Sequence, residues 1–462
     1  MSTKYQFDPT ILREYDIRGI IDRTLFVADA RAIGRAFATI ARARGARKIA
    51  VGYDGRLSSP TMADAVVDGL LAGGVDAVRI GMSPTPMLYF ACFHLEGVDG
   101  GIQITGSHNP PDYNGFKMIL QKKPFFGSDI QEIGRIAAAG TFATGAGSES
   151  SVDINAAYVN RILQDYTPGR ALKVVWDCGN GATGPTVEAL VARLPGEHTV
   201  LNAPVDGTFP VHHPDPTLPE TLQQLQAAVT AAGAELGIAF DGDGDRIGVI
   251  DGAGAVLWAD QLLVMLAADV LERHPGATII ADVKASQVLF DAVANAGGKP
   301  LMYKTGHSLI KAKMAEVKAP LAGEMSGHIF YADRYYGFDD ALYVAVRTLG
   351  ILATGTVTLE DFRKTLPVVI NTPELRFTCS EDRKFVVPQE VHARLIHAGA
   401  DVDATDGVRV NTADGWWLLR ASNTQDVLVA RCEALTEAGL ARLKQALADQ
   451  LAASNVVLPE GF

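Results

Sequence analysis

Apolar residues along the chain follow two patterns that alternate. Residues 48–53 form a short, largely apolar run of the kind found in buried strands. Residues 61–71 favour a helix, and residues 78–80 and 100–105 favour strands again, until glycine and proline interrupt the last run. This alternation predicts layers of helices packed on a sheet.

The same alternation continues further along the chain. A second unit begins with a predicted strand at residues 172–176 and continues to another at 236–240. A third contains a predicted helix at 260–271, a strand at 278–281 and a last helix at 340–352. After residues 372–373 the pattern changes to strands followed by a long helix at 437–452, which indicates a different, α+β module. Three successive α/β units therefore suggest a triplicated architecture.

Length and composition agree with a folded protein of several domains. At 462 residues the chain is too long for one ordinary core, and residues 140–151, rich in Gly, Ala, Ser and Thr, favour a linker. The formal net charge of -12 argues against a nucleic-acid-binding protein, so an anionic ligand would need a local cluster of cations. The cysteines lack a CxxC spacing, and no apolar stretch is long enough to cross a membrane. We expect a cytoplasmic protein with no membrane or nucleic-acid partner.

The segment Thr105-Gly-Ser-His-Asn-Pro110 follows a predicted strand, where a loop would project its side chains. His108 and Asn109 are placed to hydrogen-bond to a group carried by Ser107. The segment is not a hydrolase elbow, because that motif needs a glycine two residues after the serine. An ordinary Ser/Asn/Pro turn remains the alternative.

The segment Asp241-Gly-Asp-Gly-Asp-Arg246 places three carboxylates on alternate positions. Such a loop can direct all three at one Mg²⁺, which prefers oxygen ligands. An EF-hand is excluded, because its twelfth position requires Glu and holds Gly252 here. A solvated acidic turn is the alternative, although clustered like charges are costly without a cation. Arg246 would add a positive charge beside a metal-held phosphate.

Two further segments complete a pattern of four motifs. Gly323-Glu-Met-Ser-Gly-His328 and Arg420-Ala-Ser-Asn-Thr-Gln425 follow the serine and acidic loops in that order. The chain thereby resembles, over essentially its whole length, the α-D-phosphohexomutase superfamily and within it the bacterial phosphomannomutase/phosphoglucomutase family. The third motif resembles the family's sugar-recognition loop, and the fourth resembles its phosphate-binding loop.

The resemblance implies an α/β fold of four domains around a central cleft, three of them related units with mixed sheets and the fourth a smaller α+β domain. The expected domains are residues 1–152 with the phosphoserine, 153–255 with the metal, 256–368 for sugar recognition and 369–462 for phosphate binding. Mg²⁺ would be held by Asp241, Asp243, Asp245 and the phosphate of Ser107.

The resemblance also assigns roles to individual side chains. It implies catalytic roles for Ser107, His108, Lys117, Arg246, His328 and Arg18. It implies substrate-binding roles for Tyr15, Lys284, His307, Glu324, Ser326, Arg420, Ser422, Asn423 and Thr424. Lys117 and His328 are both candidates for the general acid/base.

The activity implied is the interconversion of hexose 1-phosphate and hexose 6-phosphate, of glucose and mannose, through a hexose 1,6-bisphosphate that reverses its orientation. Phosphoglucosamine mutase is an alternative, disfavoured by Met325 where those relatives usually carry Gln. A metal-dependent sugar phosphatase is an alternative of another class. The expected partners are small hexose phosphates, and for the oligomeric state we favour a monomer.

Overall fold

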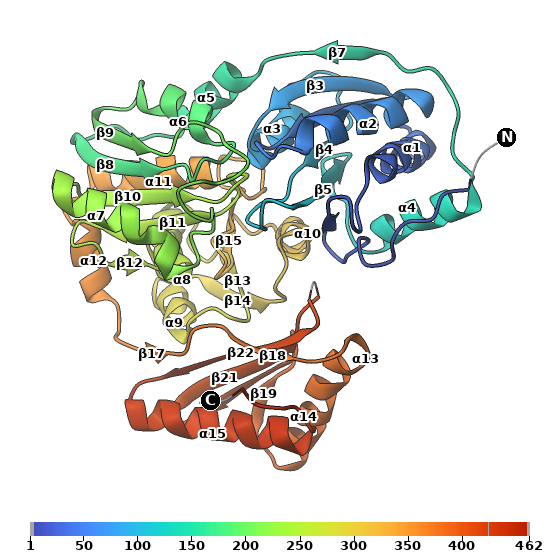
Figure 1. Cartoon of the computed structure of the whole chain (residues 1–462). Helices are drawn as coiled ribbons and strands as arrows, with labels where there is room; N and C mark the ends of the chain where they lie inside the picture. The colour runs from blue at the N-terminus through green and yellow to red at the C-terminus, as the bar shows by residue number, and fades with distance from the viewer. Residues whose placement is uncertain (1–3, 424, 460–462) are drawn as a thin grey trace.

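The computed structural model describes residues 4–423 and 425–459, and in this part of the chain four β-sheets define four domains (Figure 1). The first three sheets combine parallel and antiparallel pairs, whereas the fourth is antiparallel throughout. The predicted fold class, a four-domain α/β protein with a distinct C-terminal domain, is confirmed.

The first domain is built on a seven-stranded sheet. Its strands, in spatial order, are β1 (Ile17–Ile20), β5 (Tyr113–Leu120), β4 (Gly100–Ile104), β2 (Lys48–Tyr53), β3 (Asp76–Met82) and β7 (Glu149–Ser151), with β6 (Lys123–Pro124) beside β5. Its helices are α1 (Val27–Ala43), α2 (Ser59–Ala72), α3 (Thr85–His94) and α4 (Ser128–Ala139). Strand β7 corrects the predicted linker at 140–151, because residues 149–151 pair in parallel with β3 and extend the sheet.

The second domain repeats this arrangement on a smaller scale. Its sheet has the order β12 (Val256–Leu257), β11 (Ile247–Asp251), β10 (Leu236–Phe240), β8 (Leu172–Asp177) and β9 (Gly196–Leu201). Its helices are α5 (Asn155–Leu163), α6 (Gly184–Val191) and α7 (Gln223–Ala232), with a 3₁₀ turn at Pro219–Leu222.

The third domain has a four-stranded sheet of order β14 (Lys299–Tyr303), β13 (Thr278–Asp282), β15 (Leu321–Gly323) and β16 (Ile329–Tyr331). Its helices are α8 (Ala259–Arg273), α9 (Gln287–Asn295), α10 (His307–Val317), α11 (Ala341–Thr354) and α12 (Leu359–Thr365). The prediction that the helix at 340–352 ends this unit was wrong, since α12 follows it. Asp340 starts α11 by accepting a hydrogen bond from the Tyr343 backbone N–H at 2.9 Å.

The fourth domain lies below the other three in Figure 1. Its sheet has the order β17 (Ile370–Asn371), β22 (Val427–Ala434), β21 (Gly415–Ala421), β20 (Val408–Thr412) and β19 (Asp401–Asp403), with β18 (Leu375–Thr378) also beside β22. Helices α13 (Glu381–Lys384), α14 (Val386–His397) and α15 (Glu437–Ala453) belong to the same domain.

The four sequence motifs occupy corresponding places in these sheets. In each of the first three domains a strand with a parallel neighbour turns back into an antiparallel partner: β4 into β5, β10 into β11 and β15 into β16. The serine loop, the acidic loop and the segment 324–328 are these turns, and the fourth motif joins β21 to β22. The repeated topology therefore gives each domain one loop for a shared site.

The buried apolar side chains divide unevenly among the domains. One large cluster joins helix α3 and side chains of β2, β3 and β5 of the first domain to the second and third domains. The rest of the first domain has its own cluster, and the fourth domain has a cluster drawn only from residues 375–458. The first three domains are thus linked by apolar packing, while the core of the fourth is closed on itself.

Two further observations concern the cysteines and the apolar helices. All four cysteines are buried and free of disulfides. In the described part of the chain no single helix is long and apolar enough to cross a membrane, although α11 and α12 together, bent by 91°, meet the criteria of length and composition.

Candidate active site

The serine loop is held in place by a buried arginine. Ser107 has a positive φ of 50° and is 1% exposed, and its backbone N–H donates to Thr105 Oγ1 at 2.8 Å. The guanidinium of Arg56 donates to the carbonyl oxygens of Ser107 at 2.7 Å and of Asn109 at 2.6 Å. A left-handed conformation is uncommon for a side chain with a Cβ, so these contacts fix an otherwise unfavourable turn.

The Arg56 guanidinium also requires a glycine at position 106. A Cβ at this position would collide with the Arg56 guanidinium. Asp54 completes the support, because its carboxylate accepts the Gly106 N–H at 3.0 Å and pairs with Arg56 Nε at 3.2 Å. Sequence reasoning did not single out Arg56 or Asp54, whose segment looks like an ordinary Asp-Gly turn.

The acidic loop meets the serine loop directly. Ser107 Oγ donates to Asp241 Oδ2 at 2.8 Å and lies 3.2 Å from His108 Nδ1. The other oxygen of Asp241 accepts the backbone N–H groups of Asp245 and Arg246, each at 3.1 Å. These two bonds curl the loop so that the serine hydroxyl and the aspartates converge, although they come from different domains.

The three aspartates form a compact buried cluster. Asp241, Asp243 and Asp245 are each 0% exposed, and one oxygen from each lies within 4.8 Å of the others. Lys117 Nζ donates to Asp243 Oδ2 at 2.8 Å and also to Asp245 Oδ2, and Thr85 Oγ1 donates to Asp243 Oδ2 at 2.5 Å. Lys117 supplies one positive charge against three carboxylates.

The donor set fits a hard divalent cation. Asp243 Oδ1 and Asp245 Oδ1 are buried and have no hydrogen-bond partner among the described residues. Burial, together with the two neighbouring carboxylates, raises the pKa of Asp241 well above its usual value. Burial opposes ionisation of Asp243 too, but Lys117 and Thr85 outweigh it and lower the pKa of that carboxyl. Unpaired carboxylate oxygens in a cluster of like charge are the environment that such a cation stabilises.

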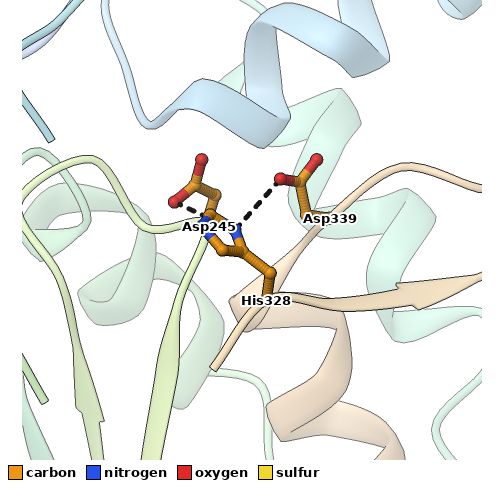
Figure 2. Close-up of side chains that lie close together, drawn as sticks. All are labelled: Asp245, His328 and Asp339. Carbon is orange, nitrogen blue, oxygen red and sulfur yellow. Dashed lines mark ion pairs between the residues drawn. The ribbon is translucent and has the colours of Figure 1, made fainter. Parts of the chain in front are cut away.

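An arginine and a histidine link this cluster to the third domain. Arg246 Nε donates to His328 Nε2 at 3.0 Å, and the two backbones form an isolated antiparallel bridge. Since Nε2 accepts this bond, the neutral ring carries its proton on Nδ1. Nδ1 lies 3.1 Å from Asp339 Oδ2 and 3.6 Å from Asp245 Oδ1, and Figure 2 shows the ring between these two carboxylates.

Asp339 and Lys311 extend this network, and sequence reasoning found neither. Lys311 Nζ donates to Asp339 Oδ1 at 2.8 Å and lies 3.3 Å from His307 Nδ1. The rings of His307 and His328 stack with centroids 5.4 Å apart. Burial disfavours an ionised Asp339, yet Lys311 and the two histidines hold its pKa well below its usual value. The pKa of His307 is also lowered well below its usual value, first by burial and then by Lys311.

Glu324 lies at the start of a tight turn between β15 and β16. Its backbone N–H donates to the His328 carbonyl at 2.8 Å, and Gly327, with φ of 91°, donates to the Glu324 carbonyl at 3.0 Å. The Glu324 carboxylate accepts the Gly306 N–H at 2.6 Å, and burial raises its pKa. Ser326 is half-buried in the same turn.

The phenol of Tyr15 joins three domains. Its hydroxyl donates to the Thr305 carbonyl at 2.8 Å and accepts from Asn423 Nδ2 of the fourth domain. Close by, Asp406 Oδ2 accepts from Arg420 Nε at 2.8 Å and from the Thr305 N–H at 3.1 Å. The predicted phosphate loop therefore contacts the first domain directly through Asn423 and is linked to the third domain through Asp406.

Three other residues were predicted for the site, namely Ser422, Thr424 and His108. Ser422 Oγ accepts the Gln425 N–H at 3.2 Å within the phosphate loop. Thr424 lies outside the described residues. The His108 ring has its pKa lowered well below its usual value, first by burial and then by Arg246.

Arg18 and Lys284 are each engaged by an acidic residue. Arg18 pairs with Asp16 at 2.5 Å and also donates to the side chain of Asn109, next to the serine loop. Lys284 Nζ lies 3.2 Å from Glu374 Oε2, and this lysine lowers the pKa of Glu374 to about 2. Lys284 thus faces the start of the fourth domain.

Comparisons with known proteins match nearly the whole chain. Models of the phosphoglucomutase/phosphomannomutase family match it as α/β/α domain I at residues 9–144, domain II at 156–254, domain III at 258–368 and the C-terminal domain at 374–450. A phosphomannomutase/phosphoglucomutase of Pseudomonas aeruginosa is 45% identical over 453 residues, 98% of each chain. A phosphoglucomutase of Neisseria gonorrhoeae is 44% identical over 438 residues, covering 94% of this chain and 95% of that one.

A solved structure agrees with the sequence comparison. The crystal structure of a phosphoglucomutase/phosphomannomutase family protein from Burkholderia thailandensis superimposes with a TM-score of 0.92 at 45% identity, over 97% of this chain and 98% of that one. The fold is that of an α-D-phosphohexomutase, and the chain belongs to the phosphoglucomutase/phosphomannomutase family. It is an isomerase that interconverts hexose 1-phosphate and hexose 6-phosphate.

Proposed function

We propose that the chain moves the phosphoryl group through a phosphorylated Ser107, with glucose and mannose phosphates as substrates and a hexose 1,6-bisphosphate as intermediate. The observation that carries this proposal is the 2.8 Å contact between Ser107 Oγ and Asp241 Oδ2. It joins a nucleophilic hydroxyl of one domain to the carboxylate cluster of another. An ordinary turn or a solvated acidic loop would not account for both groups being buried.

Asp241, Asp243 and Asp245 would hold Mg²⁺ together with an oxygen of the phosphate on Ser107. When bound, the cation would offset the negative charge that builds up on the transferring group. Lys117 and Arg246 add positive charge, since Lys117 Nζ donates to Asp243 and the Arg246 guanidinium interacts electrostatically with Asp241 and Asp245. Phosphoryl transfer depends mainly on such positioning and charge neutralisation.

In the first half of the reaction, the bond between phosphorus and Ser107 Oγ breaks while phosphorus bonds to the free O6 or O1 of the hexose phosphate. The proton of the attacked sugar hydroxyl passes to Oγ, which becomes the hydroxyl seen beside Asp241 and His108. The bisphosphate then turns end for end, and the reverse transfer restores the phosphate on Ser107. Lys117 and His328 both border this site, and one of them carries the proton. The pH–rate profiles of Lys117→Ala and His328→Gln distinguish the two.

The remaining predicted residues would hold the sugar and the phosphate that does not react. The Glu324 carboxylate already accepts a hydrogen bond from the Gly306 N–H. In the same way it suits a pair of sugar hydroxyls as donors. The phosphate that does not react would lie near Arg420, Asn423 and Tyr15, with Ser422 in the same loop as Arg420 and Asn423. Glucose and mannose differ only at C2, and a carboxylate that reads O3 and O4 would accept both. The names of the relatives, which include both phosphomannomutase and phosphoglucomutase, support this range.

Mass spectrometry and initial rates test the proposal together. The purified enzyme should carry one phosphoryl group on the peptide that contains Ser107. It should convert both glucose 1-phosphate and mannose 1-phosphate after addition of a trace of the 1,6-bisphosphate. Ser107→Ala should bind glucose 1-phosphate and not turn it over. Normal turnover by this variant would overturn the nucleophile, and accumulation of free phosphate in step with substrate loss would indicate a phosphatase instead.

A further inference from the structure

A large cavity lies between the first and third domains. Its volume is about 880 Å³, within the range of pockets that hold small molecules. Strands β5 and β6 and helix α3 line it on one side, and α10 with the segment after β16 lines it on the other. Of the candidate site residues, none of Ser107, Asp241, Asp243 or Asp245 reaches it, so it is a separate space.

Positive side chains gather around this cavity. Lys122 lies on the β5–β6 turn, Lys123 begins β6 and Lys318 follows α10, and all three are exposed lining residues. None of the three has an ion-pair partner among residues 4–423 and 425–459. The carboxylate of Asp333, which also lines the cavity, is already bound by Arg273 at 2.7 Å. A chain with a net charge of -12 therefore presents three uncompensated lysines in one place, which favours an anion.

Aromatic rings form the wall beside these lysines. Phe93, Phe126 and Tyr336 line the cavity and are only half-buried. The rings of Phe93 and Tyr336 are in contact, with centroids 4.8 Å apart, and Lys122 Nζ lies 5.2 Å from the Phe93 centroid. Half-buried rings next to lysines suit a ligand that combines a planar ring with negative charge, because stacking and charge pairing then act together.

We propose that this cavity binds a nucleoside phosphate, with the base against Phe93 and Tyr336 and the phosphates against Lys122, Lys123 and Lys318. An inorganic anion would leave the aromatic wall in contact with water. An uncharged aromatic molecule would leave the lysines unneutralised. A nucleoside diphosphate satisfies both surfaces and fits within the volume of the cavity.

Lys311 connects the cavity to the candidate active site. It lines the cavity with its Nζ 4.5 Å from the Tyr89 ring centroid, and the same Nζ donates to Asp339 Oδ1 at 2.8 Å. Phosphates held by Lys122, Lys123 and Lys318 add negative charge to the cavity that Lys311 lines, so they draw its Nζ away from Asp339 and change the support of His328. Binding should therefore lower kcat. This consequence rests on the proposed function, whereas binding itself does not.

Isothermal titration calorimetry with adenosine diphosphate tests the binding. The titration uses the full-length enzyme with saturating glucose 6-phosphate, which occupies the active site. We expect one saturable site, much weaker binding of pyrophosphate or of adenosine alone, and a parallel decrease in kcat. Absence of saturable binding would overturn the proposal, and so would equal affinity for either fragment. Binding without a change in kcat would support the nucleotide site but contradict an effect on the active site through Lys311.

Three variants locate the site. Lys318→Glu reverses an exposed charge at the cavity and should weaken binding at least about tenfold. Phe93→Leu keeps an apolar side chain but removes the ring face, and should weaken binding by about tenfold. Lys299→Glu is the matched control, because Lys299 is an exposed lysine of the same domain that does not line the cavity. Equal weakening by the control would place the nucleotide elsewhere and contradict the assignment.

Discussion

His328 Nδ1 lies 3.1 Å from Asp339 Oδ2, while Nε2 of the same ring accepts a hydrogen bond from Arg246. The hydrogen bond from Arg246 fixes the proton of the neutral ring on Nδ1, and the Asp339 carboxylate lies beside that nitrogen. Lys311 donates to the other oxygen of Asp339. The orientation of the ring therefore depends on three charged side chains, those of Lys311, Asp339 and Arg246. This arrangement makes Asp339 a positioning residue for His328.

Replacing Asp339 by Asn should therefore reduce kcat by about 10- to 100-fold, the usual size of effects from groups that orient a reactive side chain. KM should change much less, because Asp339 is fully buried behind His328 and Lys311. The pH–rate profile should also change, since the ring would lose its neighbouring negative charge. Asp340→Asn is the control, because Asp340 caps helix α11 and binds the Tyr335 hydroxyl at 2.7 Å instead. If both variants lose activity equally, the effect comes from the helix and not from His328.

Asp243→Asn should remove the response of the protein to Mg²⁺. Wild-type protein should show a higher Tm as Mg²⁺ is added, because a ligand that binds the folded state stabilises it. The variant should show little or no rise, along with a loss of most activity. Differential scanning fluorimetry over a range of Mg²⁺ concentrations measures this directly. Asp153→Asn, at an exposed aspartate of the same domain, should respond as wild type does. An unchanged Mg²⁺ response in Asp243→Asn would remove the acidic loop as the metal site.

Arg56→Lys should destabilise the protein by about 2–4 kcal/mol, because several buried carbonyl groups lose their donor. A lysine keeps the charge but cannot reproduce the fork that reaches Ser107, Asn109 and Pro110. Urea denaturation measures the loss, and phosphorylation of Ser107 should fall with it. Arg31→Lys, at an exposed position on α1, should be nearly neutral. Wild-type stability in Arg56→Lys would show that the loop does not depend on the guanidinium.

The pH dependence of stability should have a contribution from His212. Its Nε2 lies 2.9 Å from Asp177 Oδ2, and the hydrogen bond to this carboxylate raises the pKa of the histidine. The folded state therefore holds the proton more tightly than the unfolded chain. The stabilisation is complete below the unfolded pKa of about 6.5 and is lost as the pH rises through the higher folded value.

Urea denaturation at about pH 6 and about pH 8.5 measures this contribution. The difference in unfolding free energy between wild type and His212→Gln should be larger at the lower pH. A difference that stays constant, or grows with pH, would mean that the proton on His212 does not contribute to stability.

Much of the fold could be predicted from short apolar runs ended by glycine or proline. The predicted strand at 48–53 is β2, and the predicted helix at 437–452 is the main part of α15. The serine and acidic loops stood out because their chemistry lies within six consecutive residues. The family, the four-domain fold and the isomerase activity expected from these motifs are confirmed by the comparisons.

The parts that escaped prediction depend on where distant segments meet. Arg56 reaches the carbonyl group of Ser107, which lies 51 positions further along the chain, and nothing local marks this arginine. Asp339 and Asp340 look alike as acidic residues before a helix, yet Asp340 caps the helix and Asp339 faces His328. Residues 149–151 have a linker-like composition and become a strand because the edge of β3 offers them partners. Each case is decided by tertiary contacts that no local pattern encodes.

The closed apolar core of the fourth domain has a consequence for the cost of moving it. Its contacts with the first three domains are mainly hydrogen bonds and ion pairs, such as Tyr15 with Asn423 and Lys284 with Glu374, plus one small apolar cluster of Val283 with Trp416 and Leu418. Water can replace the polar partners at little net cost in free energy, and the large apolar cores stay intact. Swinging this domain away would thus require only a small part of the folding free energy. Room for the proposed bisphosphate to rotate could then be made in every catalytic cycle without approaching denaturation.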